Sequence, residues 1–242
     1  MSTETKTVRI RKLTVEVVRK DIKNLHLGVY PPNGRVRVAA PLAVSDDAIR
    51  LAVIGKLAWI RRQREKFENQ PRQTVREAVS GESHYVLGRR YRLSLIDTTG
   101  RPQVVLRTKT KMELHVPARA TKAERLAVLD RWYREQLRAA AGPLLDEWQD
   151  SLGVRVEFWG LKRMKTKWGS CNHQTKRVWL NAELAKKPLA CLEYIAVHEL
   201  VHLLEPTHGD RFVALMDEHL PDWRQRRDLL NSSPLANETW TY

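Results

Sequence analysis

The sequence has little cysteine and no long hydrophobic run. Its 242 residues include only two cysteines, Cys171 and Cys191, too few for the disulfide framework of a small secreted domain. No apolar run approaches the ~18 residues that a membrane-spanning helix needs. The first residues, Met-Ser-Thr-Glu-Thr-Lys, are polar and lead into no apolar signal region. These absences argue against a secreted or membrane protein, and we expect a cytoplasmic protein whose cysteines are thiols.

Acidic residues are also in deficit, most strongly in the first third of the chain. The net charge is +15, and residues 1–78 hold 17 Lys and Arg against 8 Asp and Glu. The hydrophobic content of 42% and charged content of 29% are typical of a globular protein. A basic N-terminal half is expected to attract DNA, a DNA-bound protein or another acidic partner. The alternative is a solvated basic surface that aids solubility.

The strongest chemical pattern lies in the run Leu189–Pro206, which predicts a buried helix that Pro206 ends or kinks. His198 and His202 are four residues apart, so they lie on one helix face and can bind a common metal ion. Glu199 lies about 100° round the helix from His198, beside the metal. There its carboxylate can take a proton from a water on the metal.

A third histidine completes this predicted site. The turn at Pro206 can bring His208 back as a ligand, and three histidines leave a fourth position open, as in catalytic zinc sites. Asp210 or Glu205 can hold a ligand imidazole by its second N–H, as metal-bound histidines require. Tyr194, one turn before His198, is a candidate to stabilise an oxyanion, but its place on the ligand side of the helix favours a role in packing beside the ligands. Zinc is inferred from the three imidazoles, and other divalent metals remain open.

We predict an α+β fold in three segments. Residues 1–78 form a basic, β-rich region with one helix, which begins at Ser45. Residues 79–150 form β-hairpins and a long helix, and residues 151–242 form the domain that carries the histidines. Further expectations are a polar linker at 68–77, a strand at 154–159 and a loose tail at 231–242.

A second hairpin is predicted just before the metal helix, between the segments 164–172 and 177–181. Its edge can pair with the main chain of an extended peptide. In this interpretation Trp168, Gly169, Ser170 and Asn181 contact the substrate. The alternative is an ordinary packed hairpin whose tryptophans lie in the core.

These motifs together resemble the YgjP-like metallopeptidases, relatives of the SprT and WLM zinc proteases. The resemblance is carried by three stretches: Lys165–Cys171, then Leu180-Asn181, then His198–Leu203 with His208 and Phe212. Upstream, Arg35–Val38, Trp59-Ile60 and Leu87–Tyr91 also match, so the likeness spans about residues 8 to 230. It implies a zincin-like, SprT-like minimal protease domain with a small sheet and an active-site helix. It also implies zinc on the three histidines and Glu199 as general base.

The sequence therefore predicts a zinc-dependent metallopeptidase that acts on a protein or peptide. Two alternatives stay open. One is a nucleic-acid-associated binding or regulatory protein whose zinc site is structural or vestigial. The other is a metal-dependent hydrolase of a non-peptide amide or ester, which the same chemistry permits.

Overall fold

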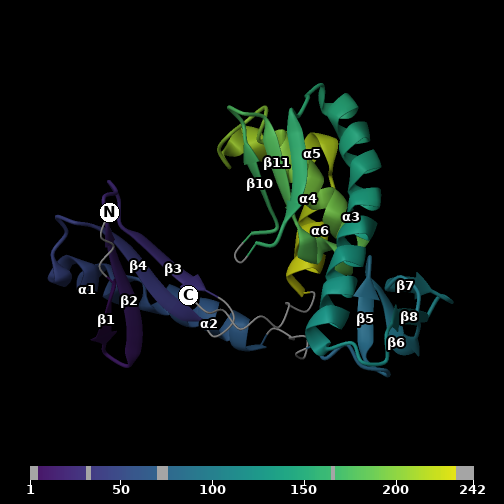
Figure 1. Ribbon diagram of the computed structural model, residues 1–242. Helices are drawn as coiled ribbons and strands as arrows, with labels where there is room; N and C mark the ends of the chain where they lie inside the picture. Colours follow the sequence, from purple (N-terminus) through teal and green to yellow (C-terminus); the bar gives the residue numbers. More distant parts are fainter. Residues whose placement is uncertain (1–4, 31–33, 70–75, 165–166, 233–242) are drawn as a thin grey trace. The chain divides into compact units, whose positions relative to one another are not determined.

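A computed structural model describes residues 5–30, 34–69, 76–164 and 167–232. Three expectations from the sequence fall wholly or partly outside these ranges: the linker at 68–77, the tail at 231–242 and the first residues of the motif at 165–171. The described residues form two compact units (Figure 1), which we call the N-terminal unit (5–69) and the C-terminal unit (76–232). Each is described by itself.

The N-terminal unit is a four-stranded sheet with two helices. The elements are β1 (Thr5–Ile10), β2 (Leu13–Lys20), β3 (His26–Tyr30), β4 (Arg35–Pro41), α1 (Asp46–Gly55) and α2 (Leu57–Asn69). The strand order is β1-β2-β4-β3, with β2 and β4 parallel and the two outer pairs antiparallel. Alternate residues of the strands, such as Val15, Val17, Val36 and Val38, pack with Ile49, Val53 and Ile60 of the helices into a core.

The prediction of one helix in this region is wrong, because the chain breaks between α1 and α2. Ser45 caps α1 as predicted, with its hydroxyl accepting a hydrogen bond from the Ala48 N–H at 3.2 Å. Gly55 ends the helix, and Lys56 has φ −105° and ψ 7° outside the helical region. The break lets Ile60 of α2 reach the same core as Ile49 and Val53 of α1.

The C-terminal unit begins with a second four-stranded sheet and a long helix. The elements are β5 (Ser83–Val86), β6 (Arg89–Asp97), β7 (Gln103–Leu106), β8 (Lys111–Val116) and α3 (Lys122–Leu152). The strand order is β5-β6-β8-β7, with β6 and β8 parallel. Thr121 and Glu124 cap α3 reciprocally, and Gly153 ends it in the left-handed conformation.

A third, three-stranded sheet and three helices complete this unit. They are β9 (Phe158–Lys162), β10 (Gly169–Asn172), β11 (Arg177–Asn181), a 3-10 turn at Ala182–Lys186, α4 (Leu189–Val201), α5 (Asp210–His219) and α6 (Trp223–Ser232). The order is β10-β11-β9, which leaves β10 at the edge. The antiparallel pairing of β10 with β11 confirms the predicted hairpin.

The strand predicted at 154–159 begins only at Phe158. Val154 and Val156 instead bond to Gln149 at the end of α3, through its main-chain oxygen at 3.0 Å and its side-chain oxygen at 2.8 Å. The main-chain oxygen and the buried side-chain amide of Gln149 thus each take up one N–H group that a strand pairing would need.

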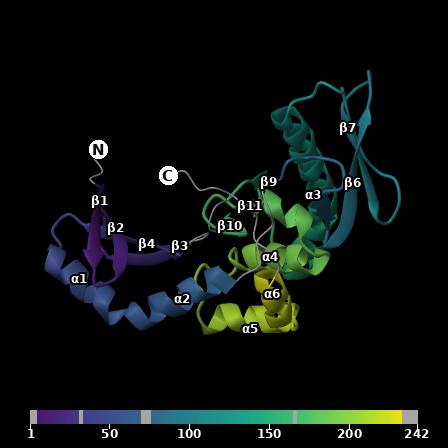
Figure 2. The same cartoon turned by 90° about the horizontal axis from the view of Figure 1, so that it is seen from below.

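One hydrophobic core runs through the whole C-terminal unit. Helix α4 lies between α3 and the three-stranded sheet (Figures 1 and 2), and Leu192, Ala196, Val197 and Leu200 are fully buried. Leu93 and Leu114 of the β5–β8 sheet belong to the same core. The predicted segments 79–150 and 151–242 therefore share their packing. None of the helices in the described ranges has both the length and the apolar character that spanning a bilayer requires.

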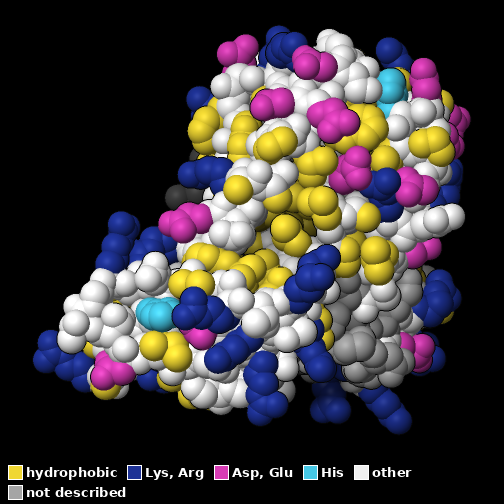
Figure 3. All heavy atoms as spheres, turned by 90° about the vertical axis from the view of Figure 1, so that its right-hand side faces the viewer, with side chains coloured by type: hydrophobic (Ala, Val, Ile, Leu, Met, Phe, Trp, Pro, Cys, Tyr) yellow, Lys and Arg dark blue, Asp and Glu magenta, His cyan; other side chains and the backbone are white. Residues whose placement is uncertain are grey.

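Charged side chains of both signs lie on the surface. On the face drawn in Figure 3, Lys and Arg side chains and Asp and Glu side chains lie between hydrophobic ones.

Candidate metal centre

Helix α4 and the turn after it position the three histidines. His198 lies in the last turn of α4, and His202 is its C-cap residue. The chain continues in turn conformation to Glu205, whose N–H bonds to the Val201 carbonyl at 2.9 Å. Pro206 has no N–H to continue this ladder. The Glu205 carboxylate then accepts bonds from the N–H and hydroxyl of Thr207, at 3.1 and 2.7 Å, and so shapes the turn that leads to His208.

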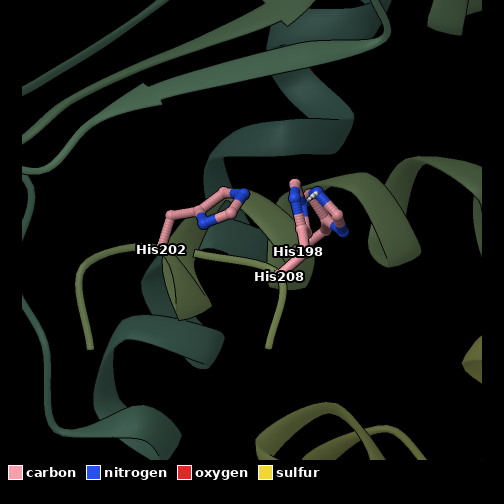
Figure 4. A group of neighbouring side chains, drawn as sticks. All are labelled: His198, His202 and His208. Atoms are coloured by element: carbon pink, nitrogen blue, oxygen red, sulfur yellow. Dashed lines mark hydrogen bonds between the residues drawn. The ribbon is translucent and has the colours of Figure 1, made fainter. Parts of the chain in front are cut away.

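The three imidazoles converge as metal ligands do. One ring nitrogen from each of His198, His202 and His208 lies within 4.8 Å of the other two (Figure 4). The Nε2 atoms of His198 and His208 are 3.1 Å apart. Ligands about 2.0–2.1 Å from a tetrahedral zinc ion are about 3.3 Å from one another. The donor type therefore fits a metal ion such as zinc, and the His198–His208 pair already has the spacing of two zinc ligands.

The surroundings favour the neutral, metal-binding form of two of these imidazoles, those of His198 and His202. Burial, followed by the neighbouring His202 and His208, lowers the pKa of His198 to about 3. Burial also lowers the pKa of His202. The Nδ1 of His202 lies 3.1 Å from the Glu205 main-chain oxygen, so Nδ1–H donates there and Nε2 is left as the ligand atom.

Phe212 is a part of the centre that the sequence analysis did not assign. Its buried ring lies 5.0, 4.8 and 4.7 Å from the ring centroids of His198, His202 and His208. It is therefore an apolar wall that all three imidazoles share. The only signal for it in the sequence was its place in the family motif, four residues after His208.

Glu199 lies beside the histidines. The residue is buried, with an exposed fraction of 5%. Burial raises its pKa to about 8, and the Lys167 charge and the Cys171 N–H oppose that rise. Gly169 of β10 makes room for it, because a Cβ there would lie 2.5 Å from Oε1 of Glu199. Only glycine lets the edge strand come this close to the carboxylate.

A cavity of about 430 Å³ joins these groups to the edge strand. It is lined by the three histidines, Glu199 and Tyr194, and by the predicted substrate residues Trp168, Gly169 and Ser170. The Cys171 thiol also lines it, but burial raises its pKa to about 11, so the thiol is protonated and a poor nucleophile.

Two of the predicted site residues have other places. Asn181 is 4% exposed, and its side-chain amide donates to the Met164 and Lys167 carbonyls at 2.9 and 2.7 Å. Asn181 thus binds main-chain carbonyl groups that precede β10. It is not among the residues that line the cavity. Asp210 lies exposed in the first turn of α5 and, within the described ranges, makes no hydrogen bond to the histidines. The main-chain oxygen of Glu205, and not its carboxylate, accepts the hydrogen bond from the His202 imidazole.

Tyr194 lies where the sequence predicted support for the centre. Its ring meets the His198 ring edge-on at 5.8 Å between centroids and stacks on Trp223 at 6.3 Å. The buried ring therefore fixes one side of His198.

The solved structures that this chain is similar to include two metallopeptidase zymogens. Abylysin from Pyrococcus abyssi is 20% identical, with 37% of this chain and 90% of that chain covered and a TM-score of 0.35. Jannalysin from Methanocaldococcus jannaschii is 23% identical, with 37% and 92% covered and a TM-score of 0.34. Comparison with curated proteins gives no match.

The family comparison covers most of the chain. Residues 23–233 match the description "YgjP-like, metallopeptidase domain", which includes β3 to α6 and the whole metal centre. The chain belongs to the YgjP-like metallopeptidase family.

Proposed function

We propose that this protein is a zinc-dependent peptidase, with zinc on His198, His202 and His208 and Glu199 as the general base. The observation that supports this most is that three imidazoles converge beside a buried carboxyl group in one cavity. When bound, zinc lowers the pKa of a water molecule toward neutrality and polarises a carbonyl group.

Glu199 would transfer the proton. A carboxyl group with a pKa of about 8 is matched to proton transfer near neutral pH, because it can both accept and release a proton there. Beside a cation the carboxylate form is favoured, as a base requires. Glu199 would accept the proton of the attacking water and pass it to the leaving amine. The Cys171 N–H orients the carboxylate for both steps.

The substrate would bind as an extended strand along β10. An edge strand offers unpaired main-chain N–H and C=O groups, and a peptide that pairs with them passes directly over the cavity. Gly169 leaves no side chain between this strand and Glu199. This arrangement favours a peptide over a small non-peptide ester, which would need no strand edge.

Elemental analysis of the purified chain tests the metal centre. We expect about one zinc ion per chain in the wild type and its loss in His202→Ala. His173 lines the same cavity but is outside the histidine cluster, so His173→Ala is the matched control and should keep the metal. A wild type without stoichiometric metal after zinc is supplied would favour a binding protein with a vestigial site.

A further inference from the structure

The two four-stranded sheets have the same topology, and each opens with a hairpin that has a two-residue turn. Arg11-Lys12 joins β1 to β2 between the paired residues Ile10 and Leu13. Leu87-Gly88 joins β5 to β6 between Val86 and Arg89. The first turn residue is left-handed in both, with φ +55° at Arg11 and +45° at Leu87. The two turns therefore hold equivalent positions in their sheets, although the second turn residue has a positive φ only in the later turn, at Gly88 (+82°).

In the C-terminal unit, this turn binds a polypeptide segment. The Leu87 N–H donates to the Ala185 carbonyl at 2.8 Å. Gly88 approaches Pro188 so closely that a Cβ would lie 2.9 Å from the Pro188 Cα. The partner is the segment 185–188, which precedes α4. This hairpin turn thus acts as a docking point for main chain.

In the N-terminal unit, the equivalent turn lines a cavity of about 360 Å³ instead. The apolar part of its lining consists of Ile10 and Leu13, beside the turn, and Leu57 and Ile60 of α2. All four side chains are aliphatic. A cavity of this size and lining accommodates an aliphatic or aromatic side chain.

Among the residues that the structure describes, the rest of the lining is cationic: Arg11, Lys12, Arg61 and Arg64. Within the described ranges, Arg11, Lys12 and Arg61 form no ion pair. The stem of Arg64 packs on Gly34, where a Cβ would lie 2.7 Å from Arg64 Cγ. The rim therefore presents a concentrated positive charge around an apolar floor.

Arg11 is an unexpected residue for its backbone conformation. A non-glycine residue at φ +55° costs about 1 kcal/mol, and two-residue hairpin turns favour Asn or Gly for this reason. Arg11 nevertheless occupies this position, as Leu87 does in the other turn, and it adds a guanidinium to the cationic rim.

We propose that this cavity, with the Arg11-Lys12 turn, binds an acidic polypeptide segment that carries an apolar anchor residue. Charge complementarity selects the acidic flanks, and the aliphatic floor selects the anchor. The equivalent turn already binds main chain, which indicates a polypeptide. Single-stranded nucleic acid is less well matched, because its bases stack on aromatic rings and the described lining of this cavity holds none.

The role of this site rests on the proposed function. A protein substrate held at the N-terminal unit is tethered to the peptidase unit by the same chain, which raises its effective concentration there. Proteins with an exposed acidic segment around a leucine or phenylalanine would then be cleaved preferentially.

Fluorescence anisotropy with the full chain tests the site. The probe is a labelled peptide, Gly-Asp-Glu-Leu-Asp-Asp-Gly, measured on a Glu199→Gln background so that no hydrolysis interferes. We expect Arg11→Gly and Arg61→Gln each to weaken binding about 3- to 10-fold. Arg11→Gly also relieves the left-handed backbone, so the fold is preserved. Arg62→Gln, an exposed neighbour outside the cavity, is the matched control and should change nothing.

Two changes to the probe separate its contacts. Replacing leucine by serine should weaken binding about 10-fold, and replacing the acids by their amides should abolish the salt dependence. The proposal is overturned if the probe fails to bind, or if Arg62→Gln weakens it as much as Arg61→Gln. It is also overturned if a DNA oligonucleotide binds through Arg11 and Arg61 and the peptide does not compete. None of these results depends on zinc or hydrolysis, so they leave the proposed function to its own test.

Discussion

The sheets β1–β4 and β5–β8 have one topology and different surroundings. In both, two antiparallel pairs flank a parallel central pair of strands. Among the described residues, the first sheet packs on α1 and α2. The second shares its core with α4, which carries the metal ligands. Its first turn binds the segment before α4, whereas the equivalent turn of the first sheet lines a cationic cavity. The comparison teaches that the role of such a sheet is set by what its turn and faces contact.

Matched core variants should separate the two sheets most clearly. Val17 and Leu93 are each the fifth residue of their strands and are buried. Leu93→Ala should destabilise the C-terminal unit by about 2–5 kcal/mol and weaken zinc retention, because its core includes α4. Val17→Ala should cost the N-terminal unit about 2 kcal/mol and leave zinc retention unchanged.

Urea unfolding with simultaneous measurement of zinc release checks this pair. If Val17→Ala released zinc as early as Leu93→Ala, the two cores would not be independent.

Acid should destabilise the C-terminal unit through a buried histidine. His84 of β5 contacts the Tyr133 hydroxyl and the Glu82 carboxylate, each at 3.2 Å. Burial lowers the pKa of His84 to about 4. Between pH 6.5 and 4 the unfolded chain therefore binds a proton that the folded chain does not. The free energy of unfolding consequently decreases as the pH is lowered through this window. The loss should be roughly 2–3 kcal/mol by pH 4.

His84→Gln should flatten this pH dependence in thermal unfolding scans. His26 of the first sheet is exposed, so His26→Gln is the control and should leave the profile unchanged. An unchanged slope in His84→Gln would show that another group titrates in this window.

The turn contacts predict a smaller difference. Gly88→Ala adds a methyl group against Pro188 at φ +82°, so it should cost about 2 kcal/mol. Gly153→Ala has a similar φ of +64° but open space around it, and should cost only about 1 kcal/mol. Equal losses in chemical denaturation would mean that the Leu87-Gly88 turn gains nothing from its contact with Pro188.

The metal ligands were predictable because their geometry is local. A helix fixes the spacing of His198 and His202, and Pro206 forces the turn that returns His208. The contacts of Asn181 and Phe212 were not, because each depends on a segment that only the tertiary fold brings near. The Asn181 amide bonds to carbonyls 14 and 17 residues away.

The shared topology of the two sheets was also invisible in the sequence, which shows no repeat. Alternation predicts strands, but it does not say that β2 pairs with β4 or β6 with β8. Similarly, the apolar pattern of 154–159 fits a strand, and only the position of the Gln149 amide shows why pairing begins later.

Hydrolysis by Glu199→Gln tests the central claim most directly. Wild type and variant, loaded with zinc, are compared for peptide cleavage, and zinc is measured in the same samples. We predict about one zinc ion per chain in both and a rate lower by about 10²- to 10⁴-fold in the variant, because the general base is lost. Full activity in a zinc-loaded Glu199→Gln variant would contradict the proposed mechanism.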